Sequence, residues 1–156
     1  MLMDANSRFS GTVGADGVRT AQAIAATAIS SNVIDLRNAT SPALADEGHN
    51  EKGIWLVVQA IQGFNTLTSL TVTLESDSAP GMATAPVVHF SKTIALAGLT
   101  AGANLARVLL PSDDYKRYLG VRYTVTGANP TLGSVFAFLA EDTQRNVQYP
   151  SGLSFV

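Results

Sequence analysis

Alternating apolar and polar positions near the C-terminal end of the chain predict a pair of β-strands joined by a turn. In the first strand, residues 118–126, every second position is apolar: Leu119, Val121, Tyr123 and Val125. Side chains of a strand point alternately to its two faces, so this strand has one core face and one solvent face. Glycine, asparagine and proline in residues 127–133 supply the backbone angles that a reversal of the chain needs.

The second strand of the pair, residues 134–140, is apolar on both faces. The two faces carry Phe136 and Phe138 on one side and Val135, Ala137 and Leu139 on the other. Such a strand is either a central strand covered on both sides or a strand that faces a partner. The pattern leaves these two interpretations equally open.

The other apolar segments are also short and are separated by turn residues. The predicted strands cover residues 21–31, 32–36, 54–61, 66–75, 87–90, 93–96 and 105–110. Within 66–75 the alternation places Leu70, Val72 and Leu74 in the core. A series of about eight short strands without a persuasive helix predicts an all-β protein, an antiparallel sandwich or barrel. No internal repeat stands out, which argues against a propeller or a β-helix.

The chain of 156 residues has a usual length for one domain, and its composition does not shift along the sequence. We expect an N-terminal arm or loop at residues 1–18, a single β-sandwich domain at 19–145 and a C-terminal tail at 146–156. The first segment is polar and rich in glycine, and its Asp16–Gly17 pair is typical of a tight turn.

Charge is sparse in this protein. Charged residues make up 14% of the chain, against about 25% in an average soluble domain. A surface of small and uncharged polar residues loses few hydrated ions when it is covered, which favours packing against other subunits. A neutral surface without a partner fits the composition equally well. No basic patch predicts nucleic-acid binding, and no apolar run approaches the ~20 residues of a membrane span.

Candidate catalytic and metal-binding residues are few. There is no cysteine, and His49 lies in a charged loop without paired ligands at a regular spacing. His89 lies in an apolar strand and is expected to be a strand-face residue rather than a base. Members of a Ser-His-Asp triad meet only in space, so the sequence alone does not exclude one. We expect no enzyme activity, metal or cofactor.

A carbohydrate-binding or host-attachment module is the alternative function, because β-sandwiches often carry such sites. These sites need exposed aromatic rings, and the candidates are Tyr115, Tyr118 and Tyr149. Trp55 is embedded in an apolar strand, which favours packing in the core.

Eight stretches spread over most of the chain carry a resemblance to a known family. They are MDAN (3–6), AQAI (21–24), NVIDL (32–36), VVQ (57–59), LTVTL with Ser76 and Asp77 (70–77), LLP (109–111), RYLGVRYTV (117–125) and GSVFAFLAED (133–142). In this order they resemble the jelly-roll cement, or decoration, proteins that reinforce the heads of some tailed bacteriophages.

The resemblance implies a jelly-roll type of β-sandwich with extended terminal segments, and a structural role without cofactor or catalytic residues. It implies a place on the exterior of the virion, where the protein would bind the capsid and bridge neighbouring capsomers. The expected partners are the major capsid protein and further copies of this chain, as a dimer rather than a trimer, with no nucleic acid and no membrane.

Contacts particular to this protein are expected where it departs from the family, at residues 11–17 and 37–53. The candidate interface residues are large and mostly near the ends of the chain: Phe9, Phe136, Phe138, Tyr149, Phe155 and Val156.

Overall fold

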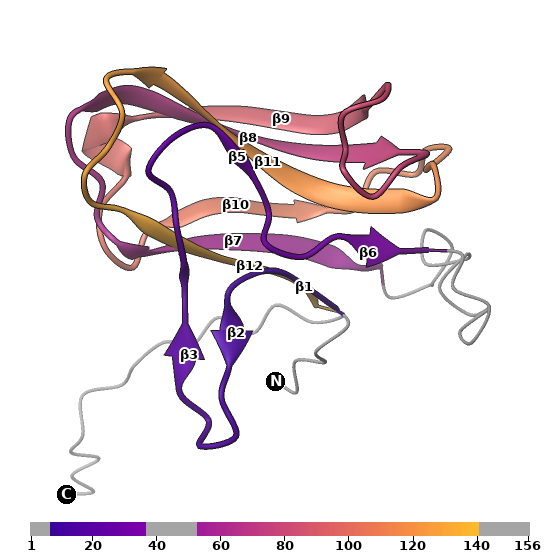
Figure 1. Ribbon diagram of the computed structural model, residues 1–156, viewed down its shortest axis with the longest axis horizontal. Coiled ribbons are helices and arrows are strands. Elements are labelled where there is room, and N and C mark those ends of the chain that lie inside the picture. The colour runs from indigo at the N-terminus through magenta and orange to yellow at the C-terminus, as the bar shows by residue number, and fades with distance from the viewer. Residues whose placement is uncertain (1–6, 37–52, 141–156) are drawn as a thin grey trace, which may run out of the picture.

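The computed structural model describes residues 7–36 and 53–140, which form two five-stranded sheets and one two-stranded sheet (Figure 1). The strands are β1 (Arg8–Ser10), β2 (Thr12–Val13), β3 (Arg19–Thr20), β4 (Gln22–Ala23), β5 (Ala28–Ile29), β6 (Ile34–Asp35), β7 (Trp55–Gln62), β8 (Leu67–Asp77), β9 (Val87–Ala95), β10 (Asn104–Leu109), β11 (Tyr118–Gly127) and β12 (Ser134–Ala140). A short 3₁₀ turn, Leu96–Gly98, follows β9. No helix in the described segments is long and apolar enough to cross a membrane.

The two larger sheets lie face to face (Figure 1). The first sheet has the order β1-β12-β7-β10, with β4 also on β12. The second has the order β5-β11-β8-β9, with β6 also on β11. Every strand pair in them is antiparallel. The predicted all-β antiparallel sandwich is therefore confirmed, and the jelly-roll connectivity remains a prediction from the resemblance.

The main core fills the space between these sheets. Its fully buried side chains come from alternate positions of the long strands: Leu56, Val58, Leu70, Val72, Leu74, Leu119, Val121 and Tyr123. The core positions predicted for β8 and β11 are thus confirmed, with Val125 only partly buried at the end of its strand. The hydroxyl of Tyr123 shares a hydrogen bond of 2.7 Å with Ser10 Oγ, so its burial leaves no polar group without a partner.

Strand β12 is covered on both faces within a single chain. Its inward side chains join the main core, whereas Phe136 and Phe138 form a second cluster with Val57 and Ala140 on the outer side of the first sheet. Phe136 is 1% exposed and Phe138 is 3% exposed. Of the two interpretations of this strand, the covered central strand is therefore the observed one.

Burial also corrects the candidate interface. Phe9 is 0% exposed and packs in the main core, because β1 pairs with β12 instead of belonging to a free arm. Phe9, Phe136 and Phe138 are interior residues and offer no surface to a partner. Tyr149, Phe155 and Val156 lie outside the described residues.

Two predicted segments differ in the structure. Residues 87–95 form one strand instead of two, because β9 pairs with β8 along its length and only a bulge near Glu75 interrupts the register, and Leu96 begins the 3₁₀ turn. Residues 21–36 form only the two-residue strands β4, β5 and β6. The N-terminal segment predicted as an arm contributes β1 to the sandwich, and only the β2–β3 hairpin projects from it (Figure 1).

Candidate functional site

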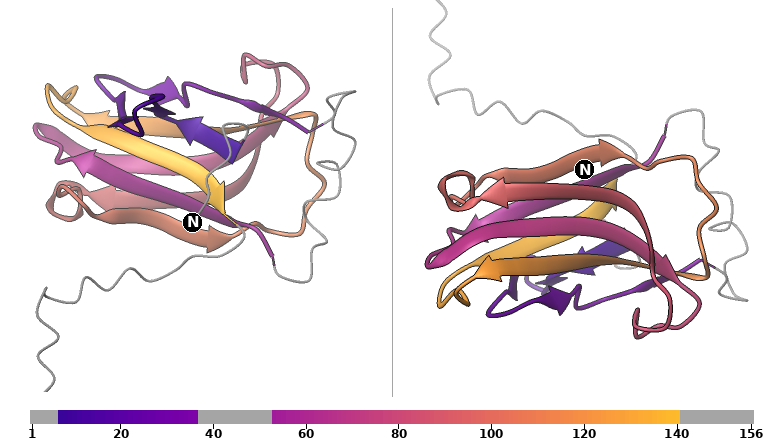
Figure 2. Two further views of the ribbon diagram at one scale, coloured as in Figure 1. Left: turned by 90° about the horizontal axis from the view of Figure 1, so that it is seen from below. Right: turned by 90° about the horizontal axis from the view of Figure 1, so that it is seen from above.

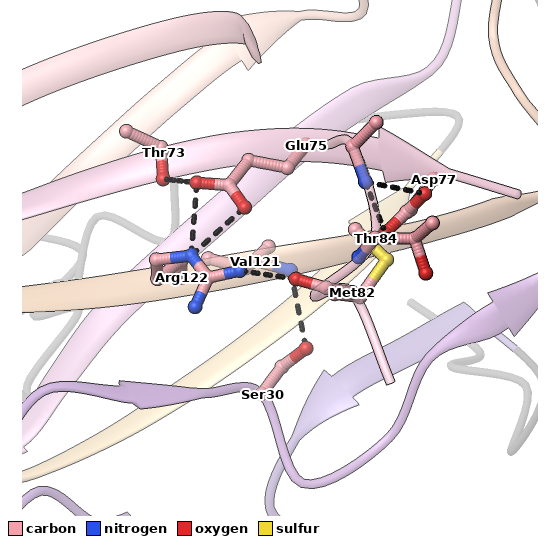
Figure 3. Close-up of polar contacts among 9 residues, drawn as sticks. Ser30, Thr73, Glu75, Asp77, Met82, Thr84, Val121 and Arg122 are labelled. Carbon is pink, nitrogen blue, oxygen red and sulfur yellow. Dashed lines mark hydrogen bonds and ion pairs between the residues drawn. The ribbon is translucent and has the colours of Figure 1, made fainter. Parts of the chain in front are cut away.

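The connection between β8 and β9, residues 78–86, is held against the second sheet by a chain of polar contacts (Figure 3). Arg122 on β11 donates from Nε to both carboxylate oxygens of Glu75, at 2.9 and 3.1 Å. Its Nη2 donates to the carbonyl of Met82 at 2.6 Å, and the hydroxyl of Thr73 donates to Glu75 at 2.7 Å. One guanidinium thus joins two strands and the loop.

The Glu75–Arg122 pair is largely removed from water. The side chain of Glu75 is 6% exposed and that of Arg122 is 29% exposed. A buried carboxylate is tolerated only with a charged partner and further hydrogen bonds, and this one has both. The Glu75–Arg122 pair therefore has a structural role, and it depends on both charged side chains and on the hydrogen bonds around them.

Asp77 closes the neck of the loop. It accepts hydrogen bonds from the backbone N–H groups of Ser78 at 2.6 Å, Thr84 at 2.9 Å and Ala85 at 3.4 Å. Burial raises the pKa of Asp77, but these donors lower it further, so the net pKa lies below that of an ordinary aspartate. A carboxylate that stays ionised keeps the two ends of the loop together.

Met82 anchors the middle of the loop. It is 0% exposed, and a Cβ atom placed on Gly120 of β11 would lie 3.4 Å from its Cε. Met82 adopts φ +51°, a left-handed conformation that a non-glycine residue holds only when its surroundings compensate. The loop is closed at its neck and fixed at its centre, as in a compact Ω-loop.

The outward side of this loop continues into the edge of the sandwich (Figure 2). Residues 78–81 and 83–88 form what we call the β8–β9 surface; most are exposed, including Val87 at 41% and Val88 at 52%. The chain carries no charge from Ser78 to Val88. β9 is the last strand in its sheet order, so among the described residues no further strand pairs with its outer edge. This rigid, uncharged surface is the candidate interaction site.

A second polar cluster has the arrangement of a Ser-His-Asp triad. Ser76 Oγ lies 2.7 Å from His89 Nε2, and His89 Nδ1 lies 2.7 Å from Asp113 Oδ2. The hydrogen bond from His89 and that from the backbone of Asp114 lower the pKa of Asp113. An ionised carboxylate only accepts, so Nδ1 donates to Asp113 and, in the neutral ring, Nε2 accepts from the serine hydroxyl.

Burial argues against catalysis by this cluster. Ser76 is 0% exposed, as is the side chain of His89, and Ser76 Oγ also accepts the backbone N–H of Lys116 at 3.0 Å. A nucleophile must reach its substrate, and this hydroxyl is enclosed and already bonded. The cluster instead clamps β8, β9 and the segment before β11 together. His89 is a strand-face residue, in line with the prediction, and its ring lies 4.4 Å from that of Tyr115.

The described tyrosines do not form an open sugar platform. The guanidinium of Arg117 lies over the Tyr118 ring at 4.9 Å, and Tyr115 packs against His89. Trp55, predicted in the core, is only partly buried, packs on the outer cluster and lies under Arg107 at 5.8 Å. Tyr149 and His49 lie outside the described residues.

Sequence reasoning missed the Glu75–Arg122 pair, although a signal was present. Both residues occupy the polar face of strands whose apolar faces were identified correctly. The sequence does not reveal that β8 pairs with β11. In that pairing Glu75 lies opposite Gly120, and it is therefore a diagonal neighbour of Arg122. The Ser76–His89–Asp113 cluster left no signal, because its members come from three separate segments.

Comparison with known proteins identifies a family. No curated protein matches the sequence. The model of the Bbp16 family matches residues 18–139, from the residue before β3 through most of β12. The match covers most of the chain and every strand of the two large sheets except β1, and the chain therefore belongs to the Bbp16 family.

Proposed function

We propose that the protein is a structural component of a tailed-phage virion, which binds the outer surface of the capsid and stabilises it by bridging neighbouring capsomers. Its partners are the major capsid protein and a second copy of itself. The resemblance of eight stretches to phage cement proteins supports this proposal, as do the low charge of the chain and the antiparallel sandwich.

The observation that carries the proposal is the β8–β9 surface. Its own exposed residues are uncharged, and the Lys116 ammonium reaches it as a donor to the carbonyl of Ala85, so covering the surface removes few ions from water. Asp77, Arg122 and Met82 hold the loop in one conformation, so little conformational entropy is lost when it binds. The outer edge of β9 offers backbone groups for pairing with a strand of a partner.

A repeating shell strengthens such contacts. A subunit that touches two capsomers gains a second contact at a high effective concentration once the first has formed. Each contact can then be modest while the bridge is stable. A rigid domain with small, uncharged contact surfaces suits this role better than one with a single deep binding site.

Fractionation of virions tests the proposal. The protein should sediment with DNA-filled heads and be reached there by antibodies or proteases from outside. Recovery only in host cytosol or only with purified tails would contradict it. Val88→Asp should weaken binding to heads by about tenfold, because an apolar contact is replaced by a charge that must leave water. Leu132→Asp is the matched control, since Leu132 is 51% exposed and lies in the β11–β12 turn at the opposite end of the sandwich (Figure 1).

A further inference from the structure

The turn between β2 and β3 contains the pair Asp16–Gly17, in a hairpin that projects from the sandwich (Figure 1). Residues 12–20 are all exposed. The Gly14 N–H donates to the Val18 carbonyl at 2.8 Å, and the Gly17 N–H donates to the Gly14 carbonyl at 2.9 Å. The turn therefore has a defined shape and is in contact with water along its whole length.

The side chain of Asp16 is folded back over its own main chain. Its Oδ1 accepts the Val18 N–H at 3.0 Å, and a Cβ atom added to Gly14 would lie 2.4 Å from the same oxygen. A carboxylate bonded to the N–H two residues ahead holds its carboxyl carbon next to the intervening peptide nitrogen, which here belongs to Gly17. The two atoms that would close a five-membered ring are therefore kept close together.

The peptide nitrogen of Gly17 is open to attack on this carbon. Glycine has no side chain that could hinder the approach, and a Cβ atom added to Gly17 would meet no other atom within 4 Å. The residue has φ +78°, a conformation that glycine adopts at little cost. Solvent therefore reaches the nitrogen and can accept its proton.

We propose that Asp16 is a site of spontaneous covalent modification, at which aspartate converts to isoaspartate. The Gly17 nitrogen attacks the carbon of the protonated Asp16 carboxyl group. The nitrogen gives its proton to solvent and the carboxyl group loses its hydroxyl, so one water molecule leaves and a succinimide ring remains. The Val18 N–H donates to the oxygen that becomes negatively charged during ring closure, which stabilises this step.

Water then opens the ring at either of its two carbonyl carbons. Addition of water to the side-chain carbonyl of the ring restores aspartate. Addition to the former main-chain carbonyl of Asp16 breaks its bond to the Gly17 nitrogen and gives isoaspartate, in which the main chain runs through Cβ and Cγ. The water that was lost is regained, so the product has the same mass as the starting chain, and no reactant other than water is needed.

The other described aspartates lack this combination of features. The side chains of Asp35, Asp77 and Asp113 accept hydrogen bonds from distant parts of the chain, and Asp77 is also 0% exposed. These three and Asp114 are each followed by a residue with a side chain, which hinders attack by its nitrogen. Among the described residues, the modification should therefore be specific to Asp16.

Isoaspartate would change the hairpin and leave the sandwich intact. It adds one carbon atom to the main chain inside the turn, which the Gly14–Val18 and Gly14–Gly17 hydrogen bonds close. The register of β2 and β3, in which Val13 lies opposite Arg19, depends on that turn. Neither strand belongs to the two large sheets. Aged chains should therefore carry an altered hairpin on an unchanged domain, whatever the function of the protein.

Peptide mapping of the aged full-length chain tests the inference. The folded protein is incubated at body temperature and mildly acidic pH, and samples are digested with trypsin. Trypsin releases residues 9–19 as one peptide, because it cleaves after Arg8 and Arg19. This peptide should separate into two chromatographic peaks of equal mass, and only the new peak should be methylated by isoaspartyl methyltransferase. A synthetic peptide of the same sequence, incubated alongside, sets the time at which the folded chain is sampled.

Two variants and the tryptic peptide that contains Asp77 are the controls. The second peak should be lost in Asp16→Glu, because a six-membered ring closes far more slowly, and reduced in Gly17→Ala, because the added methyl group hinders the attack. A single peak from the folded chain, after the synthetic peptide has given two, would show that the hairpin protects Asp16 and would overturn the inference. An undiminished second peak in either variant, or as much isoaspartate at Asp77 as at Asp16, would overturn it as well.

Discussion

Replacing Arg122 with methionine should destabilise the protein strongly, because it leaves the Glu75 carboxylate buried without its charged partner. The change removes two hydrogen bonds to Glu75 and one to the Met82 carbonyl, and only Thr73 still donates to the carboxylate. Removing one member of a buried pair costs roughly 3–5 kcal/mol. Since the Arg122 side chain is 29% exposed, we expect the lower end, about 3 kcal/mol.

Arg117, the residue directly before β11, provides a matched control. Its pair with Asp35 also has a bidentate geometry, at 2.9 and 3.1 Å, but the two side chains are 49% and 26% exposed. An exposed pair contributes about 0–1 kcal/mol, so Arg117→Met should change stability little. In a domain of this size, the Arg122 substitution should lower the melting temperature by about 6–12 °C.

Urea unfolding and calorimetry measure both variants, and limited proteolysis within residues 78–86 reports on the loop. Arg122→Met should also make the loop easier to cleave, because Met82 loses its carbonyl anchor. Adding Glu75→Gln to Arg122→Met should restore part of the lost stability, since the unpaired charge is then removed. Equal destabilisation by Arg117→Met and Arg122→Met, or no recovery in the double variant, would refute the argument from burial.

Three further outcomes follow from single positions. Gly11→Ala should lower the free energy of unfolding in urea by about 2 kcal/mol, because alanine would be strained in the left-handed conformation and would clash with Phe136. Gly17→Ala should lower it by about 1 kcal/mol, because Gly17 has φ +78° but open space around it. Ser76 should not react with a fluorophosphonate probe, because its hydroxyl is enclosed, and labelling would contradict the clamp interpretation. Burial, with the nearby Asp113 carboxylate, raises the pKa of Tyr115 from 10.0 to about 12. Folding therefore favours the neutral phenol. This contribution to the free energy of unfolding is complete below pH 10 and is lost as the pH rises to about 12. In alkaline unfolding, the stability of a Tyr115→Phe variant should therefore depend less on pH than that of the unmodified chain.

Hydrophobic alternation predicted the faces of the strands well. Leu70, Val72 and Leu74 on β8 and Val121 and Tyr123 on β11 are buried as expected. A period of two residues determines which side chains share a face, and the core requires that face to be apolar. The all-β class follows from the same pattern.

The same pattern does not say what lies above a face or which strands are neighbours. An apolar face looks alike in sequence whether a partner or the protein's own chain covers it, and for Phe136 and Phe138 the chain itself does so. Pairing register brings Glu75 to Arg122, and neither residue carries that information alone. Phe9 was assigned to an interface with the segment 1–18 predicted as an arm, and the three-residue strand β1 is too short to show an alternation that would indicate its burial.

The stabilisation of heads by the bound protein tests the central claim most directly. Heads that lack the protein would be heated with and without saturating amounts of it, and the temperature at which they release DNA would be recorded. A protein that bridges capsomers should raise this temperature, and Val88→Asp should reduce the increase while Leu132→Asp does not. An unchanged release temperature on heads that have demonstrably bound the protein would contradict the account.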